Sequence, residues 1–450
     1  MKKFSYFCLT LVLMLSYACV KEETVTTTQQ PEYIVNNDGV ELAESSLTVE
    51  QALKNMDFVQ RNIEDSYRRK REIKNIDLLS TSDVRGNTVT RSSGDATAEQ
   101  PLAYVVNFED NGGYAILAAD TQLPPVIMIG DEGNFSTEKY LEFLQQNTTR
   151  SGAELSVVED LQYAMITNSL ILTPTPMPNA PSNFRDTTVM VRCLPLVSTK
   201  WGQNKPYNYY AKTKTGLEAK AGCVPVACAQ VLASLSYHHN FIPSVAIDSN
   251  YPVNWYKINA DISNDKIRYS TNETSTNALN VASLIRALGT ATNAIYGEEA
   301  TTASVTRFAN VLLNLGCSQA ENKNHDVISL NDLFTMIVNK NQPIFTSARR
   351  VDGDDTKGHA FVLDGWLRLE YTYSIVASAG AGSINITDGR DQFDLVHINF
   401  GWSGSADGYY LPGAFNIASD EFDDYYEDND SPSNMNRNYN LNVAYILYEL

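Results

Sequence analysis

Positive charge and long hydrophobic runs are both scarce in this chain. Its 450 residues include 34 Lys and Arg against 53 Asp and Glu, which gives a formal net charge of −19. Because phosphate binding needs a positively charged surface, nucleic acid is not an expected partner. Beyond the N-terminal segment there is no run of about 18 consecutive apolar residues, so no later segment is expected to span a membrane. The 43% of hydrophobic residues is nevertheless too high for a disordered chain, and the length allows roughly two or three domains.

Cysteine is scarce as well, with six residues in the whole chain. Cys8 and Cys19 lie near the N-terminus, and the others are Cys193, Cys223, Cys228 and Cys317. Two disulfides among these four would be too few to stabilise so long a chain, so the folding energy must come from hydrophobic cores. Free thiols are an equally good interpretation. A zinc site is disfavoured, because Cys223 and Cys228 have no second close pair and the neighbouring histidines lack zinc-finger spacing.

The first residues have the pattern of an export signal. Lys2 and Lys3 precede an apolar stretch, residues 4–15, that is too short to span a bilayer. Small residues stand three and one positions before Cys19, which resembles the lipidated cysteine of bacterial lipoproteins. An ordinary signal peptide cut nearby is the alternative. We therefore predict a signal peptide over residues 1–18, a tether over 19–45, and export to the bacterial cell envelope as a lipid-anchored or secreted protein.

Residues 46–172 have the pattern of a small α+β domain. A capping box at Thr48 to Gln51 opens an amphipathic helix that we expect to reach Arg69. The turn sequence Asp110 to Gly113 separates two strands of a hairpin. The expected strands are 104–108, 114–118 and 124–130, and a further helix is expected over 138–172. Residues 173–188 contain four prolines without hydrophobic periodicity, which predicts a linker and a domain boundary.

Residues 189–450 change from helical to strand patterns. The predicted helices are 221–237, 278–288, 302–315 and 330–339. The predicted strands are 344–347, 360–363, 395–400 and 443–447. A helical half followed by an antiparallel half indicates an α+β domain.

Cys223 is the best candidate for a nucleophile. It follows Gly222 and comes two residues before Pro225, which is tolerated in the first turn of a helix but not in its interior. Cys223 is therefore expected at a helix N-terminus, where unpaired N–H groups favour a thiolate. Cys228 falls inside the same helix and is interpreted as a small buried hydrophobic residue.

His359 is the best candidate for the base among five histidines. His238 and His239 end the helix of Cys223, on the order of 20 Å from its start. His325 is expected in a solvated loop, and His397 in a strand on the same face as Asn399. His359 enters a strand through Gly358, with an Asn-bearing strand downstream to orient it. A structural core histidine is the alternative.

Four motifs around these residues resemble the streptopain family of papain-like cysteine peptidases. They are Trp201-Gly202-Gln203, Gly222-Cys223-Val224, Gly358-His359-Ala360 and His397-Ile398-Asn399-Phe400-Gly401-Trp402, in this order. The segment from Tyr104 to Phe135 resembles the family's prosegment. The resemblance implies a two-lobed papain-like catalytic domain behind an inhibitory prodomain.

The resemblance also implies a role for each site residue. Cys223 would attack the scissile carbonyl, and His359 would form the ion pair and protonate the leaving amine. Gln203 would donate to the oxyanion, and Asn399 would accept a hydrogen bond from His359. Trp402 would cover the pair from water; a buried structural Trp is the alternative. No cofactor or metal is implied.

The sequence departs from the family at three places. Phe400 stands where the family usually has Trp, and extra residues at 377–382 and 388–391 lengthen the connection from His359 to Asn399. The acidic segment 419–434 could bind Ca²⁺, but it lacks the spacing of an EF-hand, so a solvated loop is the expectation and a Ca²⁺ site the alternative.

We expect a zymogen of a cysteine endopeptidase that cleaves protein substrates and favours a bulky apolar residue two positions before the cut. The strand Ile344 to Ala348 and the segment 415–417 are candidates for that pocket. Activation is expected between Ser169 and Thr188, with Arg185 as the basic candidate. The alternatives are an inactive surface binding protein of the same fold and a Cys-His-Asn acyl transferase.

Overall fold

The computed structural model describes residues 47–63, 71–80, 101–119, 124–137, 184–352, 355–379, 383–412 and 441–450. The predicted signal peptide, Cys19, the tether, the helix over 138–172 and the acidic segment 419–434 lie outside these residues. Within the described ranges, no helix has both the length and the apolar character needed to cross a membrane.

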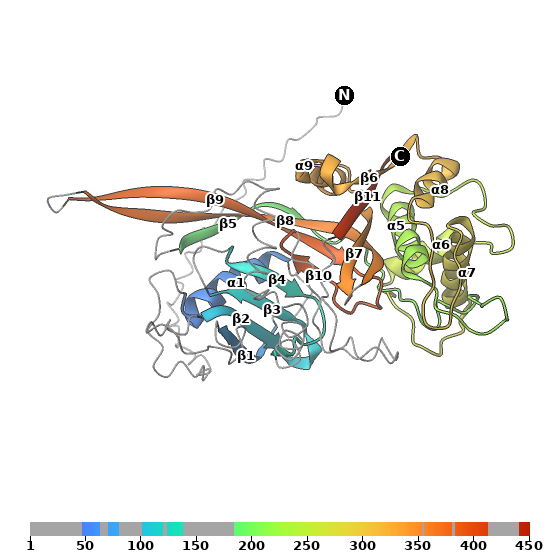
Figure 1. Cartoon of the computed structure of the whole chain (residues 1–450), viewed down its shortest axis with the longest axis horizontal. Coiled ribbons are helices and arrows are strands. Elements are labelled where there is room, and N and C mark those ends of the chain that lie inside the picture. The colour runs from blue at the N-terminus through green and yellow to red at the C-terminus, as the bar shows by residue number, and fades with distance from the viewer. Residues whose placement is uncertain are drawn as a thin grey trace, which may run out of the picture. The chain divides into compact units, whose positions relative to one another are not determined.

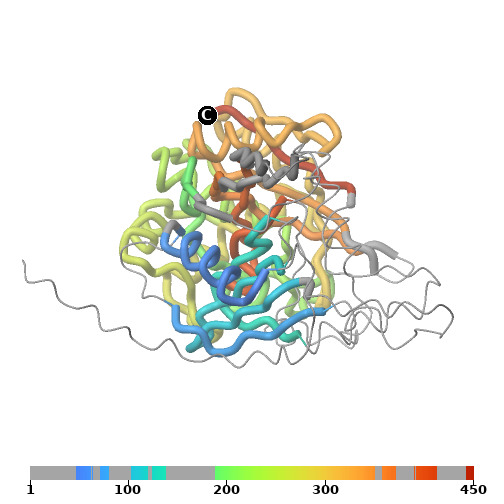
Figure 2. The backbone as a smooth tube through the Cα atoms, turned by 90° about the vertical axis from the view of Figure 1, so that its left-hand side faces the viewer, coloured from blue at the N-terminus to red at the C-terminus, as the bar shows by residue number. Residues whose placement is uncertain are grey.

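The N-terminal domain is a four-stranded antiparallel sheet with one helix against it. Helix α1 (Val49–Ile63) is followed by β1 (Ile73–Ser80), β2 (Pro101–Phe108), β3 (Tyr114–Ala118) and β4 (Val126–Gly130), which pair in that order. The capping box is confirmed, because Thr48 and Gln51 exchange backbone-to-side-chain hydrogen bonds. Figure 2 shows α1, in blue, against the cyan strands, and its apolar stripe of Ala52, Met56, Val59 and Ile63 is buried there.

The helices of the second domain occupy nearly the predicted positions. They are α5 (Cys223–His239), α6 (Trp255–Ser263), α7 (Thr276–Ala291), α8 (Arg307–Leu315) and α9 (Leu330–Phe334), which continues as a π-helical turn over Thr335–Asn339. Helix α8 begins five residues later than expected, because Thr302 pairs with Ile295 in an isolated β-bridge. Helix α6 was not predicted. Figure 1 shows α5 to α8 gathered in one group.

The strands of the second domain continue the sheet of the first. They are β5 (Phe184–Cys193), β6 (Gln319–Asn324), β7 (Ile344–Asp352), β8 (Asp355–Ala379), β9 (Ser383–Asn399), β10 (Gly408–Tyr410) and β11 (Leu441–Glu449). The order is β1-β2-β3-β4-β10-β9-β8-β7-β11-β6, with β5 beside β8, and every pair of strands is antiparallel. The α+β fold class is confirmed.

The described part of the extra residues, 377–379 and 388–391, lies in a two-stranded ribbon of β8 and β9. Strands β8 and β9 stay paired from Val362 opposite Asn399 to Ala379 opposite Ser383, and Figure 1 shows them as one long ribbon. Because the added length lies toward the far end of the ribbon, His359 and Asn399 remain together at its base.

The predicted C-terminal boundary of the linker, residue 188, is wrong. Residues 184–188 belong to β5, which pairs with β8 from Phe184 opposite Tyr373 to Cys193 opposite Trp366. Proline content predicts a linker over all of 173–188, but the partner strand that orders 184–188 is far away in the sequence. A linker can therefore extend no further than residue 183.

Candidate active site

Cys223 is the first residue of α5, as predicted. Gly222 precedes the helix with φ +91°, and a Cβ on this residue would lie 2.8 Å from the side chain of Thr301. Glycine is therefore required immediately before the cysteine. The helix is buried from Val224 to Ser236, which fixes the position of its first residue. Cys228 is fully buried, in agreement with its interpretation as a core residue.

The thiol of Cys223 lies against the strand that carries His359. Burial raises the pKa of Cys223 above its usual value, while hydrogen bonds from the backbone N–H groups of Ala360, Val224 and Cys223 itself lower it in part. Ala360 is the residue after His359, so the structure brings the two predicted catalytic segments together. Since burial alone keeps the proton on sulfur, the helix N-terminus is not sufficient to make a thiolate here.

His359 is fixed by a backbone carbonyl group. Its Nε2 lies 2.8 Å from the carbonyl oxygen of Phe400, and the side chain is buried. A carbonyl oxygen can only accept, so Nε2 carries the proton and Nδ1 is the basic nitrogen of the neutral ring. This is the tautomer that a base for Cys223 requires, if Nδ1 faces the thiol.

Aromatic rings cover His359. The ring of Trp402 stacks on the imidazole with centroids 4.3 Å apart, and the ring of Phe400 stacks on Trp402 at 5.0 Å. All three side chains are buried. The stacking of Trp402 fits both the expected cover and the alternative of a buried structural Trp, so its role stays a prediction. Phe400 places an aromatic ring at the site where the resemblance leads one to expect Trp.

Asn399 has other partners than those predicted. Its Oδ1 accepts hydrogen bonds from Nε2 of Gln230 at 2.8 Å and from the N–H of Gly401 at 3.0 Å, and its Nδ2 donates to the carbonyl of Thr199 at 2.9 Å. Among the described residues, the acceptor at His359 is the carbonyl of Phe400. The predicted direct hydrogen bond from His359 to Asn399 is therefore wrong.

The backbone of Gln203 is hydrogen bonded to the segment just before the nucleophile. Its carbonyl accepts a hydrogen bond of 2.9 Å from the N–H of Ala221, two residues before Cys223. The side chain is half-buried. This placement is compatible with an oxyanion role, which stays a prediction.

His397 has a set of ion pairs that the sequence analysis missed. Nδ1 lies 2.6 Å from Oδ1 of Asp364, and Nε2 lies 3.4 Å from Oδ2 of Asp131, which belongs to the N-terminal domain. Burial alone would lower the pKa of His397, but the two carboxylates raise it to about 10. The side chain is therefore a buried imidazolium at neutral pH. The signal in the sequence is Asp364, which stands five residues after His359.

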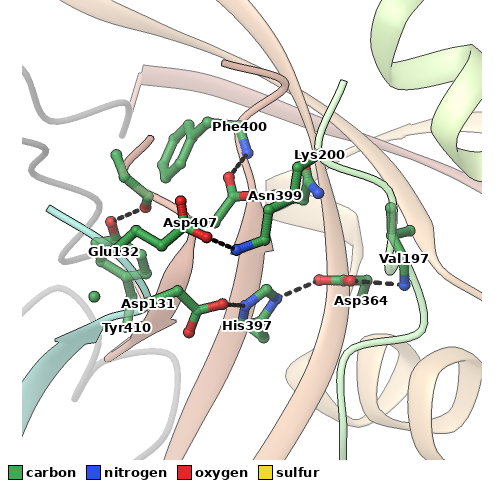
Figure 3. Close-up of polar contacts among 12 residues, drawn as sticks. Asp131, Glu132, Val197, Lys200, Asp364, His397, Asn399, Phe400, Asp407 and Tyr410 are labelled. Atoms are coloured by element: carbon green, nitrogen blue, oxygen red, sulfur yellow. Dashed lines mark hydrogen bonds and ion pairs between the residues drawn. The ribbon is translucent and has the colours of Figure 1, made fainter. Parts of the chain in front are cut away.

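The N-terminal domain docks on the second domain by strand pairing and by charge. Strand β4 pairs with β10, Gly130 opposite Gly408, and the N–H of Asp131 donates to the carbonyl of Asp407 at 2.8 Å. Figure 3 shows Asp131 aimed at His397, and Asp364 on the opposite side of that imidazole.

Glu132 adds a second charged contact between the domains. Its carboxylate forms ion pairs with Lys200 and Arg268 of the second domain. Burial tends to raise the pKa of Glu132, but the two cations together lower it. Two consecutive carboxylates, Asp131 and Glu132, thus face three cationic side chains.

The described residues offer no group of three or more His, Cys, Asp or Glu side chains that would hold a metal ion. Cys193, Cys223, Cys228 and Cys317 are all free thiols, which decides between the two interpretations of the cysteines.

Two family models match the chain. The Peptidase C10 family model matches residues 201–410, and the Spi protease inhibitor model matches residues 44–151. Streptopain of Streptococcus pyogenes is 23% identical over 349 residues, which cover 70% of this chain and 74% of streptopain.

Two solved structures from Prevotella intermedia are also similar. A mutant fragment of prointerpain A, in which one cysteine is replaced by alanine, is 24% identical with a TM-score of 0.43, over 77% of this chain and 95% of that one. Active wild-type interpain A cysteine protease is 25% identical with a TM-score of 0.39, over 57% of this chain and 95% of that one.

The helix-borne cysteine and the strand-borne histidine, held together in an α+β domain, are those of the papain-like class of cysteine peptidases. Within that class, residues 201–410 match the Peptidase C10 family, and the N-terminal domain is similar to the Spi protease inhibitor over residues 44–151. The chain is therefore the zymogen of a cysteine endopeptidase that acts on protein substrates, with its own prodomain as intramolecular inhibitor.

Proposed function

We propose that Cys223 and His359 carry out peptide hydrolysis. The observation that supports this most strongly is the position of the Cys223 thiol at the start of α5, where the backbone N–H of Ala360, the residue directly after His359, is close enough to lower its pKa. His359, with Nε2 committed to the Phe400 carbonyl, takes the thiol proton on Nδ1. Because burial holds the proton on sulfur, the imidazolium of His359 is what makes the thiolate stable.

The reaction follows from these positions. The thiolate attacks the scissile carbonyl, and the oxyanion accepts from the backbone N–H of Cys223 and from the side chain of Gln203. His359 then gives its proton to the leaving amine, and water hydrolyses the thioester with His359 as base. Trp402 keeps bulk water from the imidazole and preserves the ion pair.

The test compares two cysteines of one helix. Cys223→Ala is expected to abolish hydrolysis of a denatured protein and to leave the zymogen uncut if processing is autocatalytic, while Cys228→Ala keeps most activity. Peptide fragments ending in free carboxylates identify hydrolysis, and products joined to an added amine would identify an acyl transferase instead. Activity of Cys223→Ala together with a dead Cys228→Ala would overturn the assignment.

We also propose export with a lipid anchor at Cys19 and specificity for a bulky apolar residue two positions before the cut. Ala348 in β7 lies directly opposite His359 in β8, so the two side chains share one face of the sheet beside the site. An apolar side chain buried there would gain roughly 1.5–3 kcal/mol. Mass spectrometry of the mature N-terminus tests the anchor, and a peptide library tests the pocket.

A further inference from the structure

The peptide unit that joins Phe400 to Gly401 lies between two side chains of the site. Its carbonyl oxygen accepts from Nε2 of His359 at 2.8 Å, and its N–H donates to Oδ1 of Asn399 at 3.0 Å. One rigid plane therefore transmits the position of Asn399 to the imidazole.

Asn399 is itself held by buried hydrogen bonds. Its Nδ2 donates to the carbonyl of Thr199, and its Oδ1 also accepts from Nε2 of Gln230. The same Nε2 of Gln230 donates to the carbonyl of Thr199 at 2.7 Å. Gln230 is fully buried and Asn399 is 2% exposed, so water does not compete for these groups. The network leaves Asn399 one orientation, with Oδ1 toward Gly401.

Gln230 comes from the helix that begins with the nucleophile. It lies seven residues after Cys223, which is two turns along the same face of α5. The loop of Gly401 packs directly on this face: a Cβ on Gly401 would lie 3.1 Å from Val226 and 3.4 Å from Oε1 of Gln230. The helix that places the thiol therefore also places the carbonyl that orients His359.

We propose that Asn399 and Gln230 are positioning residues for catalysis, which act on His359 through the 400–401 peptide. The hydrogen bond from the N–H of Gly401 to Asn399 polarises this peptide and makes the Phe400 carbonyl a stronger acceptor. It also prevents the peptide from rotating, so Nε2 keeps its proton and Nδ1 stays directed for transfer. This inference rests on the proposed roles of Cys223 and His359.

The experiment uses zymogens processed by immobilised wild-type enzyme, which is then removed. Asn399→Leu, which keeps the volume but loses the acceptor, is expected to lower kcat about 100-fold with KM nearly unchanged. Asn399→Asp keeps an acceptor for Gly401 and for Gln230 but loses the donor to the Thr199 carbonyl, and is expected to recover kcat in part, to about tenfold below wild type. Rates are normalised to the amount of Cys223 that reacts with iodoacetamide, which removes any loss of folded protein.

Gln230→Glu gives a second measurement that preserves side-chain shape. A carboxylate cannot donate to Asn399, so the amide of Asn399 turns its nitrogen toward position 230 and releases Gly401; kcat is expected to fall about tenfold. The control is Ser234→Ala in the same helix, which removes a buried hydrogen bond to the carbonyl of Leu196 and should leave kcat unchanged.

Three outcomes decide between the claims. Normalised kcat that falls in Asn399→Leu and Gln230→Glu, and recovers in Asn399→Asp, supports the inference. Normalised kcat close to wild type in the first two variants, with Cys223→Ala inactive, overturns the inference and leaves the proposed function intact. Hydrolysis by Cys223→Ala overturns the proposed function itself.

Discussion

His397 stays charged in the interior of the protein because carboxylates stand on both sides of it. Its pKa is raised to about 10, so its contribution to stability is present below its ordinary value of 6.5 and is lost as the pH rises through about 10. Asp364, on one side, is completely buried. Removal of the imidazolium would leave that carboxylate without its cation.

We therefore predict that His397→Gln lowers the free energy of unfolding by about 3–5 kcal/mol near neutral pH. Urea unfolding followed by tryptophan fluorescence measures this. The difference from wild type should shrink above about pH 10, where wild type loses the same charge. His239→Gln changes a half-buried histidine that bonds to the Asn341 carbonyl; it is the control and should have little effect. An equal loss at both pH values would show that packing rather than charge is responsible.

At the scale of elements, strand β7 predicts substrate preference. Ala348 shares a face with His359, whereas its neighbour Ser347 points to the other face. Ala348→Leu should fill the pocket and lower kcat/KM about tenfold for substrates with a bulky apolar residue two positions before the cut, relative to Ala at that position.

Peptide pairs that differ at that position measure the effect. Ser347→Thr, which adds a methyl group on the opposite face, is the matched control. Unchanged preference in Ala348→Leu would place the pocket elsewhere, with the segment 415–417 as the remaining candidate.

Strand β5 predicts where activation occurs. Arg185 lies between the paired residues Phe184 and Asp186, so a cut beside it would require β5 to separate from β8. Cleavage is therefore expected within residues 169–183. The zymogen with Arg185→Ala should be processed at the wild-type rate. N-terminal sequencing of the active form checks this; a mature chain that begins at Asp186, together with an uncut Arg185→Ala zymogen, would contradict it.

Elements with a strong local pattern were predictable and those without one were not. Helix α5 and the hairpin of β2 and β3 follow from Pro225, apolar runs and the turn after Phe108. Strand β10 has three residues, too few for alternation to be recognised, and β5 has polar residues that pair with a distant strand.

The residues of the site also fall into a group that could be predicted from local sequence and a group that could not. Cys223 and His359 were found from their immediate neighbours in the sequence. The partners of Asn399 were not, because Gln230 and Thr199 reach it from separate parts of the chain. The ion pair from Asp131 to His397 likewise depends on how two domains dock.

At the scale of the whole molecule, Glu132 predicts how tightly the prodomain is held at each pH. Its pKa is lowered by Lys200 and Arg268, so its contribution to docking is present above its ordinary pKa of 4.5 and is lost as the pH falls through the lowered value. Glu132→Gln should speed the appearance of activity about fivefold at neutral pH.

The ratio of variant to wild-type rates should approach one below the lowered pKa of Glu132, since wild type is then protonated as well. Glu218→Gln is the control, because Glu218 pairs with Lys205 inside the catalytic domain and both side chains are exposed. A ratio that does not change with pH would exclude an electrostatic role for Glu132.

The shared sheet gives activation a further consequence. When the prodomain leaves, β10 loses its partner β4 and becomes an edge strand of the mature enzyme. The unpaired backbone groups of an edge strand can pair with a strand of another molecule. Because β10 spans Gly408–Tyr410, it presents a template of three residues, too short to seed stable polymerisation. The prodomain thus covers this edge of the sheet in the zymogen, and the shortness of β10 limits strand addition there after activation.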